Sequence, residues 1–489
     1  MIGQEIDRQN SSGDYSEVSS LDQLTYTGNE CRVRLTEDIV MTGAVTVNNG
    51  NRLTIDLNGH TLTAAANSQA FRIQNGALTI EDSGSTGVIQ GSGTVTGNGG
   101  AIWMSSNDSN NALTLTGGTI RGFTATDGGG VYVSGGSFEM SGGTISACNA
   151  ANAGGGVYVS SGSFEMSGGS IENCTAHEGA GVKVLASSGK ASFSMSGSGE
   201  IKNCNQDGVS IAAIGGTSEF SMSGGTIEDN SGFGVWVDNG SAVMSGGSVK
   251  GSERYDIYIG SRAALTVKNT QVGGTVLNLG KITGQGSAEF TGTVENSGYA
   301  VAEITGCKIH RIEHRSPYKG TITDSPCDEY VYLLGRSWKI PSGAGESITL
   351  KVSSYLPPVM ENSLEIPKGV TVTVDLAGKT LSAKESDFKI INYGTLTLID
   401  SSTGGTLSIP IENDDDGVLN ANGGTVTSEV TNKGTIKATG TPVTQFTGTL
   451  VNQEGASVTA GDFRGCMITN NGGTIGGDAI WDNPEPGPE

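Results

Sequence analysis

The stretch GGGVYVSGGSFEMSGGTISACNA runs from Gly128 to Ala150, and GGGVYVSSGSFEMSGGSIENCTA repeats it from Gly154 to Ala176. Self-similarity at a period of some tens of residues is the sequence signature of repeat architectures. Each repeat carries an apolar V-x-V triplet. Its first residue recurs in steps of 22 to 27 residues, at Val131, Val157, Val182, Val209, Val235 and Ile257.

Two further short apolar segments follow each triplet. The first pairs Phe with Met, at Phe138/Met140, Phe164/Met166, Phe193/Met195 and Phe220/Met222. The second starts after a Gly-rich turn, at Ile120, Ile145, Ile171, Ile201, Ile227 and Val249. Apolar residues at every second position between turns predict short strands. A strand of three residues is stable only when the next coil stacks on it in parallel, about 4.8 Å away. The predicted fold class is therefore all-β, a right-handed parallel β-helix solenoid with coils of three strands.

Stacked coils should place equivalent residues in columns. The valines and the phenylalanines each predict one buried column, and Cys148, Cys174 and Cys204 predict a column of buried free thiols. Glu172, Lys202, Glu228 and Lys250 predict an outer column of alternating charge. A register slip of one residue would destroy these columns, so they specify the pairing.

A larger duplication divides the chain into two tandem modules. TIDLNGHTL (Thr54–Leu62) matches TVDLAGKTL (Thr373–Leu381), and FRIQNGALTIEDSGSTG (Phe71–Gly87) matches FKIINYGTLTLIDSSTG (Phe388–Gly404). The predicted organisation is an N-terminal cap or leader (1–30), a first β-helix module (31–309), an irregular joint (310–346), a second, shorter module (347–480) and a linker (481–489).

Composition and charge exclude several classes of protein. The 78 glycines among 489 residues follow no three-residue period, which excludes collagen. The net charge of −22 opposes nucleic-acid binding and attraction to anionic membranes. No apolar run reaches transmembrane length, so no membrane insertion is expected. The seven cysteines form no C-x-x-C motif, and we expect neither a metal site nor a cofactor.

The DLNGHTL segment followed by GGGVYVSGGSFEMSGGTIS coils resembles the right-handed parallel β-helix surface proteins of gut bacteria, an adhesin-like group within the pectin-lyase-like fold. The resemblance covers most of residues 35–298 and, more weakly, 350–480. It implies an exported protein at the cell surface or outside the cell, with glycans or host surface molecules as partners. It leaves the activity open, because the same fold carries polysaccharide lyases, glycoside hydrolases and non-catalytic adhesins.

A catalytic interpretation would rest on His177, Glu178, Lys183 and Asp207, which lie on adjacent coils around the V-x-V strand. Carboxylates and a base in one cluster are what glycoside hydrolases and polysaccharide lyases need. The polygalacturonase signatures of the fold group do not occur here as a set. Charged corner residues are also common in any acidic protein, so the balance of the sequence favours no catalysis.

The binding interpretation rests on the outward middle residue of each V-x-V strand. The candidate ligand-binding residues in this column are Trp103, Tyr132, Tyr158, Lys183, Trp236 and Tyr258. A row of rings on a rigid sheet can stack against sugar faces, and stacking of ring on ring alone also stabilises a solenoid. The sequence therefore favours a non-catalytic, carbohydrate-binding surface protein, with a polysaccharide-active enzyme and a structural spacer as alternatives.

Overall fold

A computed structural model of the protein describes residues 15–22, 24–105, 110–314, 319–323, 327–333, 345, 347–352, 359–360, 363–438 and 444–480. The regular elements in these residues are all strands. No helix in this part of the chain is long and apolar enough to cross a membrane. The chain divides into unit 1 (Met1–Gly292, Ala300–Lys308, Gly320–Ser325) and unit 2 (Thr293–Tyr299, Ile309–Lys319, Pro326–Glu489).

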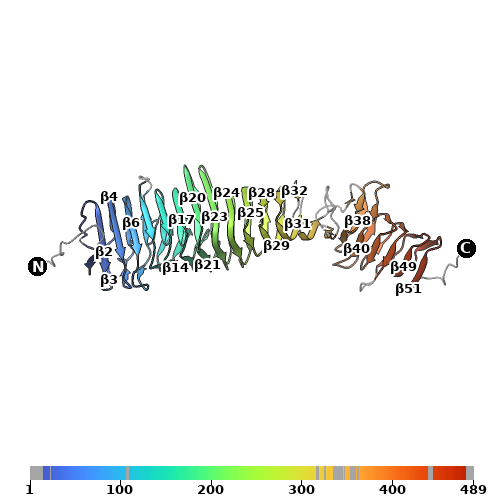
Figure 1. Ribbon diagram of the computed structural model, residues 1–489, viewed down its shortest axis with the longest axis horizontal. Helices are drawn as coiled ribbons and strands as arrows, with labels where there is room; N and C mark the ends of the chain where they lie inside the picture. Colours follow the sequence, from blue (N-terminus) through green and yellow to red (C-terminus); the bar gives the residue numbers. More distant parts are fainter. Residues whose placement is uncertain are drawn as a thin grey trace. The chain divides into compact units, whose positions relative to one another are not determined.

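Unit 1 is a stack of coils in which each strand pairs in parallel with its equivalent in the next coil (Figure 1). The V-x-V side is formed by β8 (Ile102–Met104), β12 (Val131–Val133), β16 (Val157–Val159), β19 (Val182–Ala186), β22 (Val209–Ala213), the start of β24 (Phe233–Lys250), the start of β25 (Tyr255–Lys268) and β27 (Val276–Asn278).

The Phe-x-Met side is formed by β1 (Ser16–Val18), β2 (Glu30–Leu35), β4 (Val45–Asp56), β6 (Phe71–Glu81), β9 (Ala112–Leu115), β13 (Ser137–Met140), β17 (Gly162–Met166), β20 (Lys190–Met195), β23 (Thr217–Glu228), β28 (Lys281–Gln285) and β30 (Val301–Thr305). The third side is formed by β3 (Ile39–Val40), β5 (Thr61–Thr63), β7 (Val88–Gln90), β10 (Thr119–Arg121), β14 (Thr144–Ser146), β18 (Ser170–Glu172), β21 (Glu200–Lys202), β26 (Gln271–Val272) and β29 (Glu289–Asn296). β4 and β6 also start on the V-x-V side, and β23, β24 and β25 continue round the corners.

The predicted columns are confirmed by the strand register. Val131 pairs with Val157, and the same in-register pairing continues along the column to Val235 and Ile257. The phenylalanine rings stack with centroids 4.5, 4.8 and 5.2 Å apart from Phe138 to Phe220. Such pairs contribute about 0.5–1.5 kcal/mol each beyond the area they bury.

The outer charge column is also confirmed. Lys202 pairs in register with Glu172 and Glu228, and the Lys250 ammonium lies 3.1 Å from the Glu228 carboxylate. These side chains are partly exposed, so solvent screens the pairs and each contributes little to stability.

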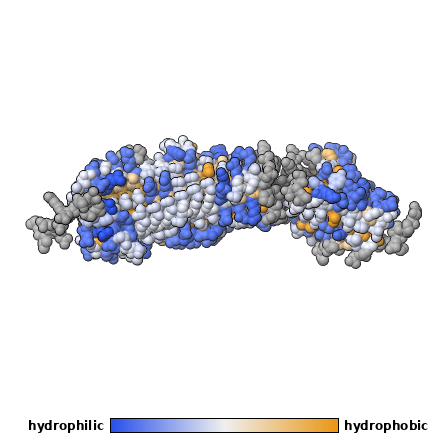
Figure 2. All heavy atoms as spheres, viewed as in Figure 1, coloured by the Kyte–Doolittle hydropathy of each residue, from blue (hydrophilic) through white to orange (hydrophobic). Residues whose placement is uncertain are grey.

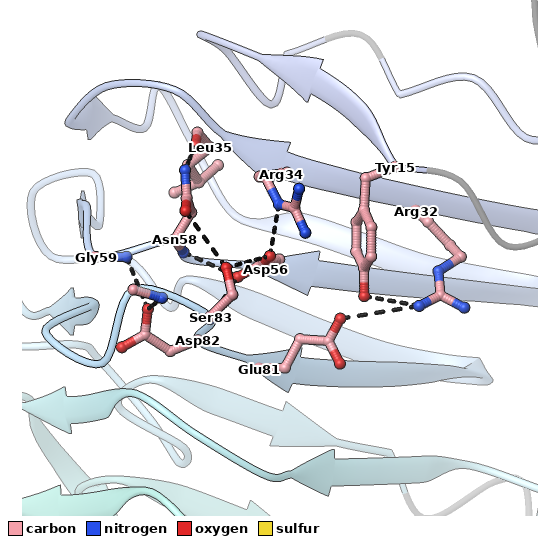
Figure 3. A network of polar contacts seen from close by, with 11 residues as sticks. Tyr15, Arg32, Arg34, Leu35, Asp56, Asn58, Gly59, Glu81, Asp82 and Ser83 are labelled. Atoms are coloured by element: carbon pink, nitrogen blue, oxygen red, sulfur yellow. Dashed lines mark hydrogen bonds and ion pairs between the residues drawn. The ribbon is translucent and has the colours of Figure 1, made fainter.

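A buried carboxylate fixes one corner of the first coils. Asp56 accepts hydrogen bonds from the backbone amides of Asn58 and Ser83, from the Ser83 hydroxyl and from Arg34 (Figure 3). Burial is the largest single effect and raises the pKa of Asp56, but the hydrogen bonds together outweigh it and hold the pKa below its ordinary value. The ring of Tyr15 lies between the guanidinium groups of Arg32 and Arg34, which ties the start of the described chain to β2.

Unit 2 is built from the same kind of coil. One side contains β34 (Ser347–Lys351), β37 (Thr371–Asp375), β40 (Thr395–Ile399), β43 (Val418–Ala421), β46 (Thr435–Lys437), β49 (Ser457–Asp462) and β51 (Thr474–Ile480). A second contains β35 (Val359–Met360), β38 (Thr380–Ala383), β41 (Thr406–Ser408), β44 (Thr425–Val426) and β47 (Gln445–Phe446). The third is a six-stranded sheet of β36 (Leu364–Ile366), β39 (Ile390–Asn392), β42 (Ile411–Asn413), β45 (Val430–Asn432), β48 (Thr449–Asn452) and β50 (Met467–Asn470).

The duplicated sequences form the same corner in both units. Asp375 accepts from the amides of Ala377 and Ser401, as Asp56 accepts from Asn58 and Ser83. In the following coil, Asp400 accepts from the amides of Gly378 and Gly405, and Asp82 in unit 1 accepts from the equivalent Gly59 and Gly87. The sequence match of the two modules therefore reflects a shared carboxylate-to-amide network.

The core of unit 2 contains a ladder of asparagines that the sequence analysis missed. The side-chain amide nitrogen of each donates to the amide oxygen of the next, at 2.7, 2.8, 2.9 and 3.1 Å, through Asn392, Asn413, Asn432, Asn452 and Asn470. Asn392, Asn413, Asn432 and Asn452 are fully buried. The ladder begins at Asn392 because the preceding coil has Ile366 at this position, and the Asn392 Oδ1 atom has no hydrogen-bond partner among the described residues.

The predicted irregular joint contains strands in its described part. β31 (Lys308–His314) and β33 (Cys327–Leu333) pair in parallel, and β32 (Lys319–Thr323) lies between them in sequence. The segment expected to be irregular therefore contains strands in these residues. Arg311 and Glu313 flank the fully buried Ile312, so their charges occupy outward positions of a strand. Residues 334–344 lie outside the described part.

We expect Asn413→Ala to lower the free energy of opening of the neighbouring coils by about 1–3 kcal/mol, because it removes the donor to the buried Asn432 Oδ1 atom and one of the two acceptors of the Asn392 amide nitrogen. Hydrogen–deuterium exchange of peptides covering residues 390–437 measures this loss. Asn420→Ala is the control, since that side chain is only partly buried and bonds the Thr397 hydroxyl at 3.4 Å. Equal protection in the two variants would contradict a stabilising ladder.

Candidate functional site

The outward column of the V-x-V side is continuous in the structure. Tyr132 pairs in register with Trp103 and Tyr158, and Lys183, Ser210, Trp236 and Tyr258 follow in the next coils. The column continues to Arg72 before Trp103 and to Leu277 after Tyr258. The predicted stripe of candidate ligand-binding residues is therefore a real spatial row.

The middle of this row is covered, whereas its ends are accessible. Tyr158 is 8%, Lys183 2% and Ser210 1% exposed, while the rings of Trp103, Tyr132, Trp236 and Tyr258 are half-buried. The expectation that Tyr158 and Lys183 present themselves to a ligand is wrong, because no ligand could reach them without moving the chain that covers them. Tyr132 and Tyr158 also stack on each other, with centroids 5.2 Å apart.

The cover is the segment that precedes each V-x-V strand. It includes a fourth set of strands that the sequence analysis missed, β11 (Thr124–Asp127) and β15 (Asn149–Ala153), with parallel bridges onward to Thr175 and Glu178. At the end of this segment, a glycine with positive φ packs against the backbone and the Cβ atom of the outward residue. A Cβ atom on Gly154 would lie 2.7 Å from the Cβ atom of Tyr158, so glycine is required there.

Three of the four candidate catalytic residues converge. The Lys183 ammonium lies 2.7 Å from the Glu178 carboxylate and 3.0 Å from the Ser210 hydroxyl. It also lies 5.7 Å from the ring centre of Trp236, in cation–π contact. The side chain of Lys183 is 3% exposed, whereas that of Glu178 is 50% exposed. The ammonium is therefore buried, and its counter-charge lies at the surface.

Asp207 lies beside this pair and is 2% exposed. Its carboxylate accepts hydrogen bonds from the amides of Gly179 and Phe233, both at 3.2 Å. Burial raises the pKa of Asp207 above its ordinary value, although the two amides and the charge of Lys183 act in the opposite direction. His177 is exposed, and no hydrogen bond joins its side chain to this cluster among the described residues.

The cluster has the properties of a structural plug. Ser210 is small, and the Lys183 side chain fills the space beside it. The Lys183 ammonium donates hydrogen bonds to Glu178 and Ser210, and the Glu178 carboxylate balances its charge. A buried cation must be paired in this way to be tolerated. Hydrolysis or elimination needs a base that can touch the substrate, and the buried Lys183 and Asp207 do not meet this condition.

A second cluster, which the sequence analysis did not single out, lies at the accessible end of the row. We call Phe233, Trp236, Tyr255 and Tyr258 the aromatic patch; their ring centroids lie 5.2 to 6.2 Å apart in the contacting pairs. All four rings are half-buried, and the exposed guanidinium of Arg254 lies 5.8 Å from the ring centre of Phe233. The signal in the sequence was aromatic residues just before two successive V-x-V triplets, in FGVWV and YDIYI.

A shallow groove of about 150 Å³ lies on the Phe-x-Met side. Its outward carboxylates are Glu139 and Glu165, which are exposed and stand in register one coil apart. The remaining lining is mostly hydroxyl-bearing, from Thr114, Ser141, Ser167, Ser194 and Ser196. The visible face in Figure 2 is predominantly of intermediate or hydrophilic character over unit 1.

The predicted thiol column is present and fully buried. Cys148, Cys174 and Cys204 are free, and each donates to a backbone carbonyl two residues earlier, at 3.4 to 3.5 Å. Hydrogen bonding to Cys174 and burial both raise the pKa of Cys148 and of Cys204. All three thiols are enclosed in the core, where no reagent reaches them, so this column contributes packing.

With this geometry, the fold is a right-handed parallel β-helix. Residues 110–272, which include the row from Tyr132 to Tyr258 and the aromatic patch, match the family described as "right handed beta helix region". Comparison with curated proteins and with solved structures gave no match.

We expect Glu178→Ala to lower the opening free energy of the coils around Lys183 by about 2–4 kcal/mol, because it leaves a buried ammonium without its counter-charge. Hydrogen–deuterium exchange of peptides covering residues 175–213 measures the effect. Glu219→Ala is the matched control: it removes the partner of Lys190 from a pair whose side chains are 61% and 43% exposed. That change should cost less than about 1 kcal/mol. Similar effects in the two variants would rule out the plug.

Proposed function

We propose that the protein is a non-catalytic, exported, adhesin-like surface protein whose V-x-V side binds carbohydrate. One observation carries this proposal: half-buried, accessible rings lie on both sides of the covered middle of the row, while Lys183 and Asp207 are buried and Lys183 is paired with Glu178. Half-buried rings on a rigid sheet can stack against sugar faces without a large ordering cost. Export and a cell-surface location follow from the resemblance to adhesin-like β-helix proteins.

A structural spacer is the second candidate function. The stacked pair of Tyr132 and Tyr158 and the mutual contacts within the aromatic patch favour it, because rings that satisfy one another stabilise a solenoid without any ligand. A spacer needs no accessible platform. The two candidates therefore differ in whether removing the accessible rings changes binding or only stability.

Screening the protein on an array of plant and mucin glycans should give binding that the double variant Trp103→Ala/Trp236→Ala loses. The physical reason is that each variant removes the large ring at one accessible end of the row. Tyr393→Ala is the control, an exposed ring of unit 2 outside the row, and should bind as the wild type does.

Two outcomes would contradict the proposal. If the wild type binds no glycan, the spacer is favoured. If the protein releases reducing ends or unsaturated uronates from the bound glycans, and Lys183→Ala or Asp207→Ala abolishes that release, the protein is a carbohydrate-active enzyme.

A further inference from the structure

We infer that the aromatic patch is the ligand site, and that it takes one or two sugar residues at the end of a glycan or in a short oligosaccharide. This inference rests on the proposed function and assigns it to particular side chains. Phe233, Tyr255 and Arg254 belong to this site although they lie outside the V-x-V row.

The length of the ligand follows from where the patch stops. On one side, the next positions in the row are Ser210 and Lys183, which are 1% and 2% exposed and lie under the covering chain. On the other side, the row continues with Leu277, which offers no ring. The platform thus spans two coils, and successive coils are about 4.8 Å apart, a step comparable to the width of one sugar ring. A long chain bound along the helix axis would find no further platform.

The polar groups at the patch suit a sugar. Arg254 is exposed, and in the described part of the chain its guanidinium makes no ion pair, although the protein carries a net charge of −22. Asp238 is also exposed and lies near the Tyr258 phenol. Burial makes the larger contribution to the raised pKa of Tyr258, and the Asp238 carboxylate makes a smaller one. A donor and an acceptor at the rim can hydrogen-bond the hydroxyls of a sugar stacked on the rings.

A further donor at the patch is unsatisfied. The Trp236 Nε1 atom is buried and has no hydrogen-bond partner among the described residues. A buried N–H group without a partner is uncommon, and such groups mark sites where a partner is expected.

The charges also exclude the main competing ligand of aromatic clusters. Quaternary ammonium groups bind where several ring faces surround a cation. Here Arg254 lies over Phe233 and Lys183 over Trp236, so two ring faces already contact cations of the protein. The exposed guanidinium of Arg254 disfavours a cationic ligand more than an uncharged sugar.

Saturation-transfer NMR and calorimetry with defined oligosaccharides test the inference on the full-length protein. The probes are the disaccharides and hexasaccharides of the cello, xylo and galacto series, and N-acetyllactosamine. We expect a disaccharide to bind nearly as tightly as the hexasaccharide of its series. We expect Tyr255→Ala and Arg254→Gln each to weaken binding about tenfold, which corresponds to about 1.4 kcal/mol. Tyr393→Ala, an exposed ring of unit 2 outside the row, should leave binding unchanged.

The outcomes separate the two proposals. Binding that survives Tyr255→Ala and Arg254→Gln but is lost in Trp103→Ala overturns the assignment of the patch and leaves the proposed function intact. Affinity that keeps rising from disaccharide to hexasaccharide overturns the short-ligand inference. Absence of binding by every probe and on the glycan array overturns both. Arg254 is exposed, so its substitution should leave the fold unchanged, and far-UV circular dichroism together with the exchange rates of residues 233–268 confirms this.

Discussion

Parallel pairing of each short strand with its equivalent in the next coil is the interaction on which the structure depends. A strand such as Val131–Val133 has few contacts of its own, and its backbone groups are satisfied only by the coils on either side. In-register pairing then forces like side chains into columns. The stacked phenylalanines and the asparagine ladder are two results of that constraint, one apolar and one polar. Each is stable because its neighbours are only about one strand spacing away.

The corners are fixed by a different interaction. Asp56 and Asp375 hold successive turns together through hydrogen bonds from backbone amides, in equivalent positions of the two units. A carboxylate that accepts several amide hydrogen bonds is stabilised in its charged form even when buried. This explains why the duplicated D-L-x-G segments are the most similar parts of the two modules. The turn needs the carboxylate, whereas the strands need only apolar residues of suitable size.

The V-x-V side shows how one column can combine stabilisation with a potential for binding. In its middle, chain segments cover Tyr158, Lys183 and Ser210, and the buried ammonium is neutralised by Glu178. Beyond the covered part of the row, two coils contribute four half-buried rings and an exposed arginine to the surface. The same outward position is thus interior packing in one coil and accessible surface two coils later.

The sequence by itself determined the fold class, the register and the identity of the columns, because these depend on a periodic pattern that recurs many times. It also placed Glu178, Lys183 and Asp207 together. It could not determine which outward residues are accessible, because that depends on what packs over them: Tyr158 is 8% exposed whereas its in-register neighbour Tyr132 is half-buried. The strands of the 310–333 segment escaped prediction because outward charges such as Arg311 masked their alternation. The tertiary structure decided that Lys183 is enclosed. It also decided that Tyr255 and Arg254 lie beside Trp236 and Tyr258. Burial depends on which segments pack over a strand, and a local sequence pattern does not record that.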